Sequence, residues 1–181
     1  METKMSDIIT RLTIEELRDS FQNVGYRVET LTDPVANTTY LRSATAGLGF
    51  EIRPGNQLIG EEQGFVDATL VTTLQVQGEL PLDLVNRWNA TRRFGRLQLS
   101  HPFLVFCLDV SVAGGVAPNF VRAQIEIWDR LVQELIAYLR EELPKLAARN
   151  GAAAAAPQPA APAQQPAREH ASEAGAVPTI Q

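Results

Sequence analysis

The chain has 181 residues, a hydrophobic content of 45% and a formal net charge of −5, values typical of one soluble globular domain. This acidic balance does not favour nucleic acid or an anionic membrane surface as a partner, because both reward clustered Lys and Arg. The single cysteine excludes an internal disulfide framework and a multi-thiolate metal site, and two histidines leave little for zinc chemistry.

The N-terminal segment has no basic region followed by an apolar run, so we expect no secretory signal. No stretch of about 18 apolar residues is present, so we expect no membrane span. Both expectations favour a cytoplasmic location.

The first helix is expected to begin at Thr13. Thr13 and Glu16 have the spacing of a capping box, in which each side chain bonds the other residue's backbone N–H. Apolar residues then recur every three or four positions, and Gly25 supplies the left-handed stop.

From residue 26 to 76 the hydrophobic period changes to two, which predicts strands. A hairpin is expected, because a turn-forming Asp-Pro-Val-Ala-Asn segment separates the first two alternating runs. Alternation that regular indicates an antiparallel sheet with one buried side. The four expected strands are 26–31, 38–43, 48–53 and 66–76.

The second half predicts a helix from Pro81, a short strand at 97–99, a long strand at 103–112 and a long helix from Pro118 or Asn119 to Leu143. Pro144 is expected to end or kink that helix. The helix would be about 37 Å long at 1.5 Å per residue, so part of it could cover another subunit.

We therefore predict one α+β domain over residues 7–146, with helices packed on an antiparallel sheet of five or six strands in the order α-β-β-β-β-α-β-β-α. Residues 147–181 are rich in Ala, Pro and Gln, with few large apolar side chains to bury, which predicts a disordered tail.

Several short motifs, in this order, carry a family resemblance. They are Val85 to Asn89 (VNRWN), Arg93-Phe94, Leu108-Asp109 and Gly114 to Val116 (GGV). Together with the order of elements over Thr13 to Leu143, they resemble the YbjN family of bacterial proteins. The resemblance implies a fold like that of type III secretion chaperones, often dimeric, and a role in sensory transduction regulation. It implies no catalytic residues, so no active site is carried over.

One face of the long strand at 103–112 is too apolar to be simply solvated and too polar to be plain interior. Parity places Phe65 and Val71, just before and within the strand at 66–76, on the same side of the sheet as this face. Together the two strands give a candidate protein-interaction surface of Phe65, Val71, Phe103, Val105 and Cys107. The alternative is that the long helix covers this face within the same subunit.

Catalysis by Cys107 is disfavoured, although Asp109 shares its strand face and His101 precedes the strand. His101 would lie about 20 Å away along an extended chain, too far to act as a base. Gly114 and Gly115 precede a helix but lack the lysine and glycine spacing of a phosphate loop, so a tight turn is favoured. The acidic pair Glu61-Glu62 is expected to be solvated.

Four arginines, Arg87, Arg92, Arg93 and Arg96, form a candidate patch for an anion or an acidic partner. The competing interpretation is that they are favourable charges at a helix C-terminus. Trp88 and Trp128 are expected in the core, and Asn89 is expected to make a capping or loop hydrogen bond.

The favoured function is a non-enzymatic, protein-binding regulatory or chaperone-like module that acts as a homodimer without cofactor or metal. The alternative is a regulator that senses a small molecule or nucleotide in a pocket near the 57–64 loop.

Overall fold

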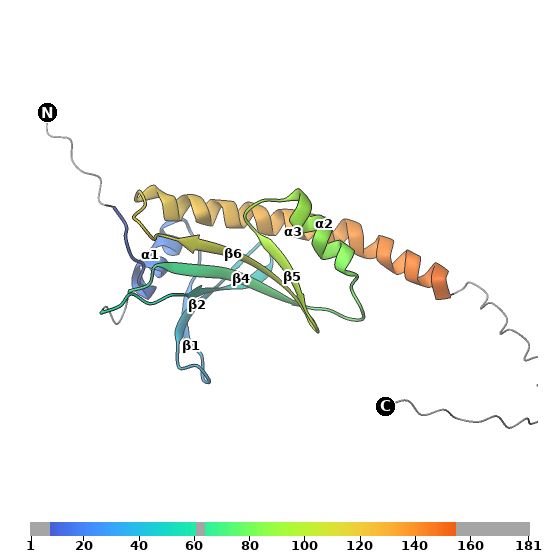
Figure 1. The fold of residues 1–181 in the computed structure, drawn as a ribbon, viewed down its shortest axis with the longest axis horizontal. Helices are drawn as coiled ribbons and strands as arrows, with labels where there is room; N and C mark the ends of the chain where they lie inside the picture. Colours follow the sequence, from blue (N-terminus) through green and yellow to red (C-terminus); the bar gives the residue numbers. More distant parts are fainter. Residues whose placement is uncertain (1–7, 61–63, 155–181) are drawn as a thin grey trace, which may run out of the picture. The chain divides into compact units, whose positions relative to one another are not determined.

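The computed structural model describes residues 8–60 and 64–154. It divides into one unit ending at Lys145 and a second beginning at Leu146. The described residues form three helices and a six-stranded antiparallel sheet (Figure 1). The predicted α+β class and the predicted order of elements are confirmed. The elements are α1 (Ile14–Asn23), β1 (Glu29–Thr32), β2 (Thr39–Thr45), β3 (Leu48–Pro54), β4 (Asp67–Gln75), α2 (Leu82–Thr91), β5 (Arg96–Ser100), β6 (Phe103–Ser111) and α3 (Asn119–Ala154).

The start of α1 has the predicted capping box. The backbone N–H of Glu16 donates to Thr13 Oγ1 at 3.1 Å, and the backbone N–H of Thr13 donates to Glu16 Oε2 at 3.0 Å. Two donors that no helical carbonyl could satisfy are therefore paired. Gly25 follows the helix with a φ of +94°, the left-handed conformation expected of a stop.

The strands lie in the order β1-β2-β3-β4-β6-β5, and every neighbouring pair is antiparallel. We call the face that carries Phe50, Leu70 and Phe106 the inner face, and the opposite one the outer face. Inner-face side chains are nearly all buried, as the period of two predicts.

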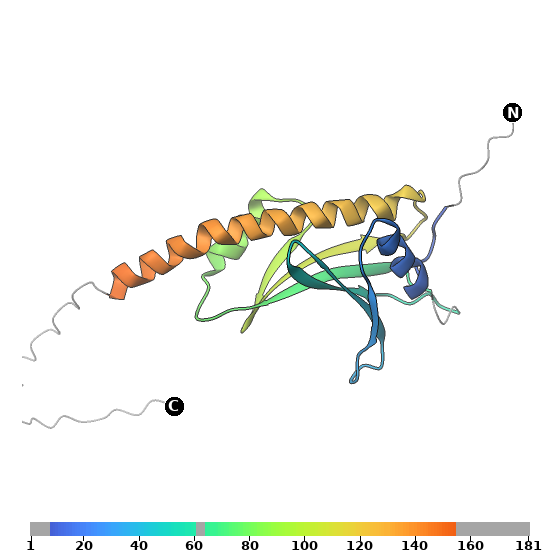
Figure 2. The same ribbon diagram turned by 180° about the vertical axis from the view of Figure 1, so that it is seen from behind.

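The helices α2 and α3 lie on the same side of the sheet, as both ribbon views show (Figures 1 and 2). Their contacts identify it as the inner face. Trp128 of α3 stacks on Phe106 at 5.4 Å between ring centroids and also contacts Phe50, while Trp88 of α2 makes a T-shaped contact with Phe106, also at 5.4 Å. Both tryptophans are fully buried, so the prediction that they are core residues is confirmed.

The long helix does not end at Pro144, so the expectation of an end at this residue is wrong. α3 continues to Ala154 and includes the first eight residues of the segment predicted as a tail. Pro144 is exposed, so the carbonyl that loses its N–H partner at this turn can bond water instead. Residues 155–181 lie outside the described part of the chain.

Candidate functional site

The two longest strands, β4 and β6, place four of the predicted interaction residues together on the outer face. Val71 lies opposite Cys107, Thr73 lies opposite Val105, and Phe103 follows two residues along the same strand face. Cross-strand neighbours of this kind have Cβ atoms about 5 Å apart. We call Val71, Phe103, Val105 and Cys107 the outer apolar patch.

No described helix covers this patch. Phe103 is 40% exposed, while Val71 and Val105 are half-buried. The alternative that α3 covers the outer face is wrong, because Trp128 of α3 packs against Phe106 on the inner face. The patch is therefore a surface of this chain.

Cys107 is the exception within the patch, because it is only 5% exposed. The edge strand β5 flanks it: the side-chain Nε2 of Gln98 lies 3.9 Å from its sulfur, and the sulfur lies 3.8 Å from the backbone carbonyl oxygen of Arg96. Burial raises the pKa of the Cys107 thiol, and this outweighs the lowering effect of the Arg96 charge. The sulfur is thus a neutral, packed thiol, a poor nucleophile.

One rim of the patch is an ion pair between neighbouring strands. Arg96 on β5 bonds Asp109 on β6, and Thr69 on β4 donates a further hydrogen bond to Asp109 at 2.9 Å. The hydrogen bond from Arg96, followed by that from Thr69, lowers the pKa of Asp109 despite some desolvation. Asp109 is therefore a fixed carboxylate with partners.

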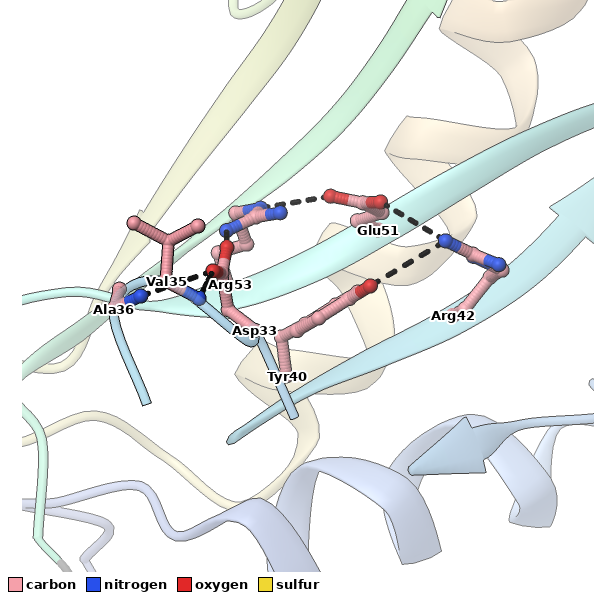
Figure 3. A network of polar contacts seen from close by, with 7 residues as sticks. All are labelled: Asp33, Val35, Ala36, Tyr40, Arg42, Glu51 and Arg53. Carbon is pink, nitrogen blue, oxygen red and sulfur yellow. Dashed lines mark hydrogen bonds and ion pairs between the residues drawn. The ribbon is translucent and has the colours of Figure 1, made fainter. Parts of the chain in front are cut away.

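The opposite rim is a chain of alternating charges on β2, β3 and the β1–β2 turn (Figure 3). Arg53 bonds Glu51 at 2.7 Å and Asp33 at 3.4 Å, and Glu51 also pairs with Arg42 at 3.5 Å. The Arg53 guanidinium also lies 4.5 Å from the centre of the Tyr40 ring. Such a network fixes long side chains in place more effectively than isolated surface pairs do.

Asp33 connects this network to the turn between β1 and β2. Its carboxylate accepts the backbone N–H groups of Val35 at 2.9 Å and Ala36 at 3.0 Å (Figure 3). The Ala36 amide and then the Val35 amide are the main causes that lower the pKa of Asp33. The Asp of the predicted turn therefore both forms the turn and orients Arg53.

The two rims carry no net charge. Their three cations, Arg42, Arg53 and Arg96, are each paired with at least one of the three acids Asp33, Glu51 and Asp109. An apolar centre bordered by satisfied charges resembles the surface of a protein interface more than it resembles an ion-binding site.

Phe65 does not join the patch. It precedes β4 and makes isolated bridges with Leu12 and Gln57. It lies six positions before Val71, which is about 20 Å along a strand. Phe65 instead lines a cavity of about 570 Å³ together with Ile14, Tyr40, Arg53 and Gln57, among other residues.

That cavity lies beside the loop where the alternative function places a ligand pocket. Its lining includes the aromatic residues Tyr40 and Phe65, several threonines and Arg53. Glu61 and Glu62 lie outside the described residues, so their predicted solvation stays a prediction.

A second cavity, of about 740 Å³, was not predicted from the sequence. It is bordered by Asp129 of α3, which accepts hydrogen bonds from Tyr26 at 3.1 Å, from Thr45, and from Gln133 at 2.8 Å. Tyr26 and Asp129 are 103 positions apart, so no local motif could indicate their contact. Desolvation is the main cause that raises the pKa of Tyr26.

Three of the four predicted patch arginines have separate partners. Arg87 pairs with Glu142 of α3 at 2.6 Å, and Arg96 pairs with Asp109 on the outer face. Arg92 lies over the rings of Trp88 and Tyr138, at 4.9 Å and 5.3 Å from the ring centres. The structure therefore does not bring the four charges together as one anion site.

Asn89 fulfils its predicted hydrogen-bonding role in an unexpected place. Its Nδ2 donates to the carbonyl of Leu97 at 2.9 Å, and its Oδ1 accepts the N–H of Leu97 at 2.9 Å. The carboxamide thus occupies the free edge of β5 as a neighbouring strand would, and it protects that edge from pairing with another chain.

Gly114 and Gly115 form the favoured tight turn. Both have positive φ, at +82° and +89°, and the N–H of Gly115 donates to the carbonyl of Val112 at 2.9 Å. A Cβ at Gly115 would lie 2.5 Å from Cγ2 of the exposed Ile8 side chain, so that side chain would have to move aside, whereas the positive φ favours glycine directly.

Over the residues that the structure describes, no group of three or more His, Cys, Asp or Glu side chains could hold a metal ion. Within the same residues no helix is long and apolar enough to cross a membrane.

Comparison with known families finds a match over most of the chain. The family model YbjN, described as "Putative bacterial sensory transduction regulator", matches residues 13–141. No curated protein matches the chain, and no solved structure does. The expected likeness to type III secretion chaperones therefore stays a prediction.

Proposed function

Because the chain belongs to the YbjN family, we propose that it is a non-enzymatic regulator that acts by binding a protein partner through the outer apolar patch. The family description gives a role in regulation, and the proposal adds how that role is performed. The proposed setting is the bacterial cytoplasm, and the proposed assembly is a homodimer.

The observation that carries this proposal is the uncovered patch itself. Val71, Val105 and Phe103 lie side by side on two paired strands, and the helices pack on the other face. Contiguous exposed apolar side chains with a polar rim mark interaction sites on soluble proteins. The rigid sheet fixes the positions of these side chains before binding, which reduces the entropy cost of association.

The non-enzymatic part of the proposal is supported by the chemistry of the patch. The one thiol is buried with a raised pKa, and Asp109 is held by Arg96 and Thr69. The Cys107 thiol and the Asp109 carboxylate therefore have structural roles. Thiol catalysis would need a base within hydrogen-bond reach of the sulfur.

Affinity capture from the bacterial host tests the proposal. The bait proteins are the wild-type chain, Val105→Asp, Val105→Thr and Ala123→Asp, the last adding the same charge on an exposed position of α3. We expect wild type and Ala123→Asp to capture a host protein that Val105→Asp does not capture. The same host protein, once purified, should bind the wild-type chain directly. Val105→Thr keeps the side-chain shape and the strand preference, so its intermediate loss would exclude unfolding as the cause. Equal capture by all four baits would refute the proposal.

The cavity beside the 57–64 loop supports the second candidate, a small-molecule sensor. A volume of about 570 Å³ is within the range of ligand pockets, and Tyr40 and Phe65 offer ring surfaces next to the Arg53 guanidinium. A panel of nucleotides and metabolites, screened by thermal shift against wild type and Phe65→Ala, tests this candidate. A ligand that raises the Tm of wild type only would support it, because preferential binding stabilises the native state.

A further inference from the structure

We propose that the cavity beside Asp129 binds a small primary amine, whose ammonium group bonds the side-chain oxygens of Asp129, Tyr26 and Thr45. This cavity has a volume of about 740 Å³. None of the described residues that line it belongs to the cavity beside the 57–64 loop or to the outer apolar patch. Amine binding here is therefore independent of the proposed protein binding.

Three elements bring the oxygens of this site together. Asp129 lies on α3, Thr45 is the last residue of β2, and Tyr26 follows the end of α1. The hydroxyl groups of Tyr26 and Thr45 both donate to Asp129 Oδ1, and Gln133 Nε2 donates to Asp129 Oδ2. These donors are neutral, and no Lys or Arg of the described residues forms an ion pair with Asp129. The carboxylate therefore carries a negative charge that is not paired.

The hydroxyl groups of the cavity wall have no protons left for a ligand. Tyr26 and Thr45 give theirs to Asp129. The buried Ser43 donates to the carbonyl of Arg27 at 2.7 Å. Each hydroxyl oxygen still has lone pairs, and Asp129 Oδ2 can accept one more hydrogen bond. An ammonium group, which has three donors and no acceptor, is the complementary ligand.

The charges of the cavity also favour a cation. Its charged lining residues are Arg27, Glu29, Arg42 and Asp129. Arg42 is already paired with Glu51 at 3.5 Å, and the opposite charges of the exposed Arg27 and Glu29 cancel. Asp129 thus supplies an excess negative charge, which a ligand with one positive charge neutralises.

The oxygens are held in place before a ligand binds. The backbone N–H of Tyr26 donates to the carbonyl of Phe21 at 3.1 Å. The Tyr26 ring makes T-shaped contacts with Phe21 and Phe50, at 5.6 Å and 5.9 Å between centroids. Desolvation raises the pKa of Tyr26, so its hydroxyl keeps the proton that it donates to Asp129. Such a site loses little conformational entropy on binding.

The rest of the cavity suits a short aliphatic chain. Its volume is within the range of small-molecule sites, and Val24, Gly25, Ala44 and Gly49 give it small or apolar walls. Arg27 forms no ion pair within the described residues, so it is available to the carboxylate of an amino acid. Amines and amino acids share the ammonium group, and the experiment distinguishes them.

An NMR titration of the isotope-labelled full chain at neutral pH and constant NaCl concentration tests the proposal. Four probes are compared. Butylamine carries the ammonium group, and L-norvaline is butylamine with an added carboxylate. Butanol lacks the charge, and tetramethylammonium lacks the N–H donors. We expect butylamine to shift the amide signals of residues 24–29 and 43–45 saturably, with a Kd of about 10 mM or below, and the last two probes to cause no such shifts.

The two binding probes identify the source of the ammonium group. Norvaline bound more tightly than butylamine would indicate an amino acid, whose carboxylate contacts Arg27. Norvaline bound more weakly would indicate an amine without a carboxylate.

Three variants test the residues. Asp129→Asn keeps the side-chain size and removes the charge, so it should raise the Kd of butylamine at least about tenfold. Glu126→Gln removes a charge from an exposed position of the same helix, so it should leave the Kd unchanged. Thr45→Val keeps the β-branched shape and removes one acceptor, so it should raise the Kd about threefold even if Asp129→Asn is poorly folded.

Three results would overturn the ammonium site. They are the absence of saturable butylamine binding to wild type, the same Kd for wild type and Thr45→Val, and equal shifts with tetramethylammonium or butanol. Each of them would leave partner binding by the outer apolar patch intact. Equal capture of host proteins by the Val105→Asp bait would in turn leave amine binding intact.

Discussion

Replacing Asn89 by alanine should destabilise the protein by about 2 to 3 kcal/mol. The substitution removes two hydrogen bonds of 2.9 Å to the backbone of Leu97, each contributing about 1 kcal/mol to stability. Leu97 is only 1% exposed, so its N–H and carbonyl would be left partly desolvated without partners, which adds to the loss. At about 2 to 4 °C per kcal/mol for a domain of this size, Tm should fall by about 4 to 12 °C.

Asn86→Ala is the matched control, because Asn86 lies one turn earlier on α2, is exposed and makes no side-chain hydrogen bond within the described residues. Urea unfolding, followed by fluorescence of the two buried tryptophans, measures both variants at low protein concentration, where self-association contributes little. Asn86→Ala should change the free energy of unfolding by less than about 0.5 kcal/mol. Equal effects of the two substitutions would refute the role assigned to Asn89.

Three further predictions concern single side chains. Phe94→Gly should stabilise the isolated chain by about 1 kcal/mol, because glycine relieves the positive-φ strain; a destabilisation in urea would contradict this. Asp109 has a lowered pKa in the folded state, mainly through its bond to Arg96, so this contribution to stability is present above the unfolded pKa near 3.8 and is lost as pH falls through the folded pKa. Asp109→Asn should therefore flatten the acid limb of the stability curve, and an unchanged limb would exclude that linkage. Cys107 should react with iodoacetamide at pH 8 at least about tenfold more slowly in native protein than in urea, since burial raises the pKa of its thiol; equal rates would show that the thiol is accessible.

Local signals predicted the elements well, because each depends on neighbours in the sequence. The capping box of Thr13 and Glu16 is formed by residues three apart, and the period of two placed Val71, Val105 and Cys107 on the same face. Both signals follow from the geometry of one helix turn or one strand.

Contacts that depend on strand register or on helix docking could not be predicted. The pairing of Arg96 with Asp109 requires the register of β5 on β6, and the contact of Asn89 with Leu97 requires the docking of α2 beside the sheet edge. Phe65 has the parity of the outer face, but it lies two residues before the first residue of β4. Its backbone pairs with Leu12 there, so Phe65 does not extend the outer face of the strand. The alternation of side chains along a strand predicts which face of the sheet each residue occupies. It does not predict the residue at which the strand begins or ends.

Binding of a protein partner at the outer apolar patch can be measured with purified components. Isothermal titration of the captured, purified partner into wild type, Val105→Asp and Ala123→Asp tests it most directly. A carboxylate desolvated at the centre of the patch should cost at least about 2.7 kcal/mol, which corresponds to a Kd raised about 100-fold for Val105→Asp and unchanged for Ala123→Asp. The same Kd for wild type and Val105→Asp, with the fold intact, would contradict the account.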